Sequence, residues 1–151
     1  MDRLSPERRS YLMSRVRSKD TTPEMVVRKL VHRLGYRFRL HSCSLPGKPD
    51  LVFPSRKKII FVHGCFWHRH LGCAKATVPK SHTDFWQEKF DKNVRRDQHL
   101  VTELSAQGWE IMVVWQCETN DGDSLRAKLV RFLEGRVPTS GLFACLHEER
   151  P

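Results

Sequence analysis

Residues 49–63, with the sequence PDLVFPSRKKIIFVH, decide the expected fold of this 151-residue chain. The apolar run at 51–53 predicts a short strand, and the run at 58–62 predicts a second one. The residues between these runs have the composition of a turn, so the two strands are expected to pair as a hairpin. The hairpin would start directly after Asp50 and return the chain to His63.

The predicted elements around this hairpin alternate between helices and strands. Helices are expected at 5–17, 22–34, 83–107 and 124–133, and further strands at 36–40 and 109–115. This order predicts one α/β domain at 1–134, with a mixed central sheet flanked by helices. Residues 135–151 lack periodicity and are expected to form a loose tail.

The composition favours a nucleic-acid partner. Lys and Arg number 27 against 17 Asp and Glu, a formal net charge of +10. Neutralised phosphates release condensed counterions, so such a surplus suits a polyanion, although a generally basic protein is the alternative. No stretch reaches the roughly 20 apolar residues of a membrane span, and the N-terminus lacks a secretory pattern. We therefore expect a cytoplasmic protein without membrane association.

Asp50 is the first candidate for chemistry. Pro49 restricts the backbone and holds the chain extended just before this aspartate, at the point where loop becomes strand. A carboxylate in that place suits a hard cation that also contacts phosphate oxygens. A lone Pro-Asp pair is more often part of an ordinary turn, so the interpretation depends on what lies nearby.

The segment HGCFWHRHLGC at 63–73 supplies that neighbourhood. Cys65, His70 and Cys73 present the ligand types and short spacing of a structural zinc site. Cys117, just past the strand at 109–115, is the best fourth ligand, and Cys43 is the runner-up. Unliganded buried thiols are the alternative. Cysteines outside the site, Cys145 included, would remain free thiols, because an odd count of five argues against a disulfide framework.

Two histidines of this segment are left over for acid–base chemistry. Imidazole titrates near working pH, so His63 and His68 could act beside Asp50, or they could be hydrogen-bonded structural residues. Asp97 falls on the apolar stripe of the long helix, where a carboxylate needs a partner. We expect it to accept a hydrogen bond from a catalytic histidine, unless it is only partly buried at the edge of the helix.

Aromatic residues are concentrated beside the same segment. Phe66 and Trp67 lie within it, and Phe85 and Trp86 open the long helix. In a basic protein, exposed aromatic side chains can stack on bases or wedge between base steps. Core packing is the alternative, and it is expected for Trp109 and Trp115.

Five short motifs follow one another along the chain. They are LPGKPD (45–50), IIFVHGCFWHRH (59–70), TDFW (83–86), NVRRD (93–97) and GWEIMVVWQC (108–117). In this order they resemble the Vsr family of very short patch repair endonucleases, over about Arg9 to Glu118. The resemblance implies a restriction-endonuclease-like fold with a structural zinc site. It also implies magnesium-dependent nicking of one DNA strand 5′ of the thymine in T:G mismatches, which arise by deamination of 5-methylcytosine.

The resemblance also implies roles for individual residues. Asp50 would bind Mg²⁺, with His63 and His68 at the cleaved phosphate, Asp97 behind His68, and Glu24 contacting metal-bound water. Val62 stands where some relatives have threonine, and it would bind Mg²⁺ through its backbone carbonyl. The implied zinc ligands are Cys65, His70, Cys73 and Cys117. The implied DNA-contacting residues are Phe66, Trp67, Trp86 and, in an N-terminal helix within 1–20, Met13 and Val16.

The expected partner is double-stranded DNA containing a T:G mismatch, with repair-pathway proteins as further candidates, and the enzyme is expected to be a monomer. Two other functions fit the same residues. One is a restriction-like nuclease acting on modified or unmispaired DNA. The other is a non-catalytic DNA-binding module stabilised by zinc.

Overall fold

The computed structural model describes residues 5–15 and 20–135. The helices are α1 (Pro6–Ser14), α2 (Thr22–Arg33), α3 (Thr83–Ala106) and α4 (Gly122–Glu134), with short 3-10 turns at η1 (Pro54–Arg56) and η2 (Gln116–Asn120). The strands are β1 (Arg39–Leu40), β2 (Leu51–Phe53), β3 (Lys58–His63) and β4 (Glu110–Trp115). The predicted order of helices and strands is confirmed, with boundaries moved by one to three residues in most elements.

The four strands form one mixed sheet in the order β1-β2-β3-β4. The predicted hairpin is confirmed, because β2 and β3 pair antiparallel with Leu51 opposite Ile60. Its turn includes Lys57 in the left-handed region, with φ of 55°. On the other side, β4 runs parallel to β3 along its whole length, from Lys58 opposite Glu110 to His63 opposite Trp115.

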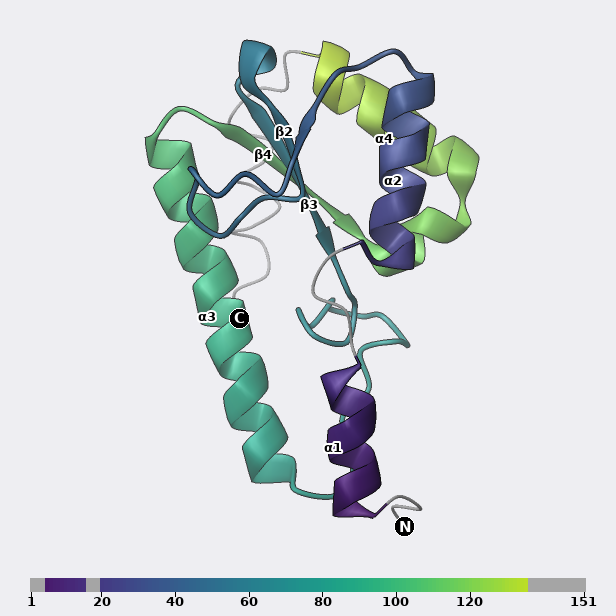
Figure 1. Ribbon diagram of the computed structural model, residues 1–151, viewed down its shortest axis with the longest axis vertical. Coiled ribbons are helices and arrows are strands. Elements are labelled where there is room, and N and C mark those ends of the chain that lie inside the picture. The colour runs from purple at the N-terminus through teal and green to yellow at the C-terminus, as the bar shows by residue number, and fades with distance from the viewer. Residues whose placement is uncertain (1–4, 16–19, 136–151) are drawn as a thin grey trace.

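Alternate residues of the strands face two separate cores. On one face, α2 and α4 cover a cluster that includes Leu51, Ile60 and Val114. On the other face, the C-terminal half of α3 covers a smaller cluster that includes Ile59 and Leu104. Figure 1 shows the sheet between these two layers, with α1 standing apart from it. The sheet is therefore flanked by helices on both faces, as predicted.

Two predicted elements are shorter than expected. Only Arg39 and Leu40 of the strand expected at 36–40 pair with β2, because the partner strand has just three residues. Tyr36 instead packs into the larger core, and its hydroxyl donates to Glu134. The first helix stops at Ser14, and the predicted tail beyond residue 135 lies outside the described residues. Among the described helices, none combines the length and apolar character needed to cross a membrane.

The loop at 41–50 is docked against α3, and this contact places Asp50. Leu45 packs against the smaller core. Gly47 has φ of +75°, and a Cβ added there would lie 2.6 Å from a methyl carbon of Leu100. Glycine is favoured at this position by both the left-handed backbone and the close approach to the Leu100 side chain.

Gly47→Ala should therefore destabilise the protein by about 2–3 kcal/mol, from left-handed strain plus overpacking against Leu100. Gly108→Ala is the matched control, because Gly108 has φ of +89° but no atom within 4 Å of an added Cβ. The control should cost only the backbone strain, about 1 kcal/mol. Urea unfolding of both variants measures the difference, and equal losses would rule out the contact with Leu100.

Candidate active site

Asp50 lies at the start of β2 and is fixed by the neighbouring strand. Its Oδ2 accepts a hydrogen bond of 2.7 Å from the backbone N–H of Val62. Extending the β2–β3 register by two places sets Pro49 opposite Val62. Pro49 has no N–H, so it cannot donate to the Val62 carbonyl. A strand residue directs its N–H and C=O to the same side, so that carbonyl oxygen faces Asp50. A carboxylate and an oxygen without its ladder donor thus lie together.

Burial is the main influence on the Asp50 carboxyl group. It raises the pKa of Asp50 to about 6, and the nearby negative charge of Glu24 adds to the rise. The hydrogen bond from Val62 and the proximity of His41 and His68 oppose it. At neutral pH the group is an ionised carboxylate held in an unfavourable environment, which a bound cation would relieve.

Glu24 belongs to a buried ion cluster at the start of α2. Its side chain is 3% exposed and accepts from Arg28 at 3.0 Å and from the backbone N–H of Asp20 at 2.8 Å. Arg28 also pairs with the Asp20 carboxylate at 2.7 Å and donates to His41 Nε2 at 2.7 Å. The guanidinium therefore supplies the positive charge for both carboxylates.

Sequence reasoning missed most of this cluster. Arg28 follows Glu24 by one helical turn, a spacing that signals an ion pair and could have been used. Asp20 and His41 reach Arg28 from outside the helix, and nothing in their spacing predicts that contact. The consequence is that Glu24, whose charge raises the pKa of Asp50, shares the single positive charge of Arg28 with Asp20.

The two histidines form one stacked pair. The rings of His63 and His68 lie 3.9 Å apart at an angle of 7°. Burial lowers the pKa of His63 to about 3, helped by the neighbouring charge of His68. His68 Nδ1 is 2.6 Å from Asp97 Oδ2. A carboxylate can only accept, so the Nδ1 side of the ring carries a proton, and Nε2 points away from Asp97. The expected contact between Asp97 and a histidine is present.

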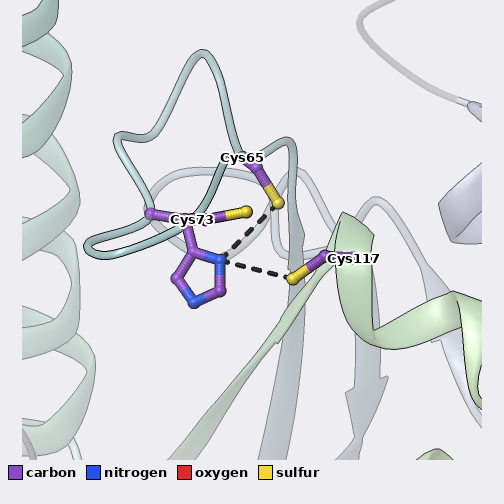
Figure 2. A group of neighbouring side chains, drawn as sticks. Cys65, Cys73 and Cys117 are labelled. Carbon is purple, nitrogen blue, oxygen red and sulfur yellow. Dashed lines mark hydrogen bonds between the residues drawn. The ribbon is translucent and has the colours of Figure 1, made fainter. Parts of the chain in front are cut away.

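Four potential metal ligands form a second group, and Figure 2 shows its three cysteines, Cys65, Cys73 and Cys117, directed toward one another. The ligand atoms of Cys65, His70, Cys73 and Cys117 all lie within 4.8 Å of one another. His70 Nδ1 is 3.7 Å from Cys65 Sγ and 3.4 Å from Cys117 Sγ. Tetrahedral zinc with ordinary Zn–S and Zn–N bonds would separate its ligand atoms by roughly 3.5–3.8 Å. The spacing of the group therefore fits that metal.

The electrostatics of the thiols also fit a cation. Burial and the nearby Cys65 and Cys73 raise the pKa of Cys117 to about 11. Three thiolates at this distance would repel one another, and a divalent ion would remove that repulsion. Cys43, the runner-up ligand, is exposed and lies outside the group.

The aromatic residues pack together at the start of α3. Phe66 contacts the rings of Trp67, Trp86 and Phe90, with centroids 5.1–5.7 Å apart. Trp86 is only 4% exposed, whereas Phe85 is 59% exposed. For Trp86 the core-packing alternative therefore holds in the free protein. Trp86 precedes Phe90 by four residues in α3, so both side chains lie on the same face of the helix and pack in the aromatic cluster.

Polar contacts hold the backbone of this aromatic loop. Arg69 donates to the carbonyls of Phe66, Ala76 and Thr77 at 2.9–3.1 Å, and its guanidinium lies 3.9 Å from the centre of the Phe90 ring. Asn93 of α3 donates to the Trp67 carbonyl at 3.1 Å. Phe66 and Trp67 are thus fixed to α3 while remaining partly accessible.

Two residues expected at the DNA interface, Met13 and Val16, were predicted in the first helix, and the structure describes them only in part. Met13 belongs to α1, but its side chain and the whole of Val16 lie outside the described residues. Tyr11 and Leu12 of the same helix are exposed, at 56% and 47%.

Known proteins share both the sequence and the fold. Residues 1–75 match the family described as DNA mismatch endonuclease Vsr. A relative from Xanthomonas oryzae pv. oryzae, the type II nicking enzyme V.XorIIP, is 56% identical over 88% of this chain and 97% of its own. The DNA mismatch endonuclease Vsr of Escherichia coli is 39% identical over 78% of this chain and 74% of its own. Among solved structures, the catalytic domain of the homing endonuclease I-Bth0305I matches with a TM-score of 0.54 and 20% identity, covering 75% of this chain and 94% of that one.

These similarities define the protein as a DNA endonuclease. The chain belongs to the Vsr family of DNA mismatch endonucleases.

The buried charge of Asp50 has a measurable effect on stability. Its folded pKa of about 6 lies above the ordinary value of 3.8. The stabilising contribution is therefore present below pH 4 and is lost as pH rises through 6. Without added Mg²⁺, Asp50→Asn should be more stable than wild type by up to about 3 kcal/mol at pH 7.5, with no advantage at pH 4.

Urea unfolding at the two pH values measures this difference. Asp91→Asn, at an exposed position of α3, is the control for removal of one negative charge. An Asp50→Asn advantage that is absent at pH 7.5, or equal at both pH values, would contradict the buried-charge interpretation.

Proposed function

We propose that this protein nicks one strand of duplex DNA 5′ of the thymine in T:G mismatches, initiating very short patch repair. The observation that carries the proposal is that Asp50, held by the Val62 N–H, lies near the His68–Asp97 pair at one end of the sheet, in a member of the Vsr family. The restriction-endonuclease-like fold is part of the same proposal, and the mixed sheet with its hairpin supports it.

Asp50 and the Val62 carbonyl are the residues that would hold Mg²⁺. The fit rests on a buried carboxylate with a raised pKa beside an oxygen that Pro49 cannot pair. When bound, Mg²⁺ supplies charge stabilisation to the phosphate and to the leaving oxygen. Glu24 lies close enough to influence Asp50, and we assign it the binding of water at the edge of this site.

His68 is the group that moves a proton. Asp97 fixes the Nδ1–H tautomer, so His68 Nε2 is free to take a proton from the attacking water. His63 is neutral at working pH because burial lowers its pKa to about 3. Its stacked ring orients His68 and can donate or accept one hydrogen bond at the phosphate.

We assign a structural Zn²⁺ to Cys65, His70, Cys73 and Cys117. One ion held by all four of these donors would have no open position for substrate. His63 precedes the first of these ligands by two residues, and Phe66, Trp67 and His68 lie between Cys65 and His70 in the sequence. The four ligands, once bound to one ion, would therefore restrain the short segment that carries both the catalytic histidines and the aromatic side chains.

Phe66 and Trp67 are the proposed mismatch-reading residues, with Trp86 behind them. A weakened T:G pair costs less to unstack than a matched pair, so an aromatic wedge would select it. Trp86 would reach the bases only if Phe66 and Phe90 moved away from it. Met13 and Val16 are assigned to the same DNA interface on the family resemblance alone. We expect one monomer to act on one duplex.

The function is tested by a nicking assay with Mg²⁺ on T:G duplexes in varied sequence contexts. Wild type should nick only the strand with the mispaired thymine, and T:A and C:G duplexes should stay intact. Asp50→Ala and His68→Ala should lower kcat by at least about 100-fold. His32→Ala, at an exposed position of α2, is the matched histidine control and should nick at the wild-type rate.

Two outcomes would favour the other functions. Equal cleavage of T:G and matched duplexes would indicate a restriction-like nuclease with the same site. Full nicking activity in Asp50→Ala would remove the mechanism, and binding of DNA without any cleavage would indicate a non-catalytic binding module.

The zinc assignment predicts about one equivalent of zinc in the purified protein. Cys73→Ser and Cys117→Ser should lose most of it and unfold at lower temperature. Cys43→Ser is the matched control and should keep the metal, since Cys43 is exposed and outside the group. Elemental analysis and thermal unfolding test this, and metal-free wild-type protein would refute it.

A further inference from the structure

Trp115 stands between the metal-ligand group and the histidine pair. It is the last residue of β4, and the parallel register sets it opposite His63 of β3. Two residues later the chain reaches Cys117 in η2. The backbone N–H of Trp115 donates to the Glu118 carboxylate at 3.0 Å, and the Lys128 ammonium group donates to the same carboxylate at 2.7 Å. The backbone at Trp115 is thus fixed on both sides.

The indole ring contacts both groups directly. His70 lies flat against it, with centroids 4.3 Å apart and an angle of 8°. His63 meets it edge-on at 5.4 Å and 75°. His63 in turn stacks on His68, which bonds to Asp97. The rings therefore form a continuous row from a metal ligand to the catalytic base, with Trp115 as the shared member.

Packing, more than hydrogen bonding, orients His63 in this row. Its ring contacts are with Phe61, His68 and Trp115, and the residue is 8% exposed. His70 directs Nδ1 toward the thiols, so a metal bound there would restrain one edge of its ring, while the indole packs across its face. Moving the indole would therefore change the angle of both imidazoles.

We propose that Trp115 is a positioning residue that couples the Cys65/His70/Cys73/Cys117 group to the His63–His68 pair. It acts on the metal through His70 and on the reaction through His63, without contacting DNA or the cleaved phosphate. The inference rests on the proposed function for the histidines, but its metal arm does not depend on catalysis.

The first test replaces the indole. Trp115→Leu should release its metal to a chelator about 10–100-fold faster than wild type and should lower kcat by a similar factor, with KM for DNA unchanged. Trp115→Phe keeps an aromatic face and should restore most of both properties. Trp109→Leu is the matched control, because Trp109 immediately precedes the opposite end of β4 and lies against Lys57. It should change neither metal release nor kcat.

The second test removes the stack and leaves the indole in place. His70 approaches the thiols through Nδ1, the ring nitrogen that is closer to the backbone. The sulfur introduced by His70→Cys could therefore lie close to the position of Nδ1 and replace it as a metal ligand. This variant should retain one equivalent of metal but lose kcat about 10-fold, because Trp115 has lost its stacked partner. It also keeps the proposal testable if Trp115→Leu does not fold.

The results separate the two proposals. Unchanged metal release in folded Trp115→Leu, or wild-type kcat in metal-loaded His70→Cys, would overturn the coupling while leaving the nuclease assignment intact. Wild-type nicking by Asp50→Ala and His68→Ala would instead overturn the proposed function. In that case faster metal release from Trp115→Leu would still support the structural half of the coupling.

Discussion

The pairing of β3 with both of its neighbours is the constraint on which the site depends. Antiparallel pairing with β2 returns Asp50 to the Val62 N–H, and parallel pairing with β4 brings Trp115 beside His63. The site therefore joins groups from the ends of three neighbouring strands, which lie at the same end of the sheet. A shift of β3 by one residue would exchange its two faces and move every one of these contacts.

The same arrangement concentrates unfavourable charge. Asp50 and Glu24 are two carboxylates in a poorly hydrated place, and burial together with their proximity raises the pKa of Asp50 to about 6. Arg28 pairs with both Glu24 and Asp20, one positive charge for two carboxylates, and donates no hydrogen bond to Asp50 among the described contacts. The charge of Asp50 is thus left for a cation, and the neutral His63 adds no positive charge beside it.

Local sequence signals were sufficient for the elements but not for their lengths or for the polar clusters. The β2–β3 hairpin and the long α3 follow from apolar periodicity and turn composition, both of which act over a few residues. The short β1 was not foreseen, because the alternating pattern at 36–40 does not show which of its residues pair with β2. The burial of Trp86 depends on Phe66 and Phe90 from two different segments. The meeting of Arg28 with His41 likewise depends on tertiary packing, which no spacing along the chain encodes.

Segment 63–73 shows how one short stretch serves two sites without mixing them. His68 turns toward Asp97 and His70 toward the thiols, although only Arg69 separates them. Arg69 has φ of 56°, in the left-handed region that a long side chain rarely adopts. Its three hydrogen bonds to carbonyls at both ends of the loop compensate for that strain. The change of backbone direction at Arg69 thus lets His68 and His70 contact different partners. The indole of Trp115 contacts both His63 and His70, and so connects the histidine pair with the metal-ligand group.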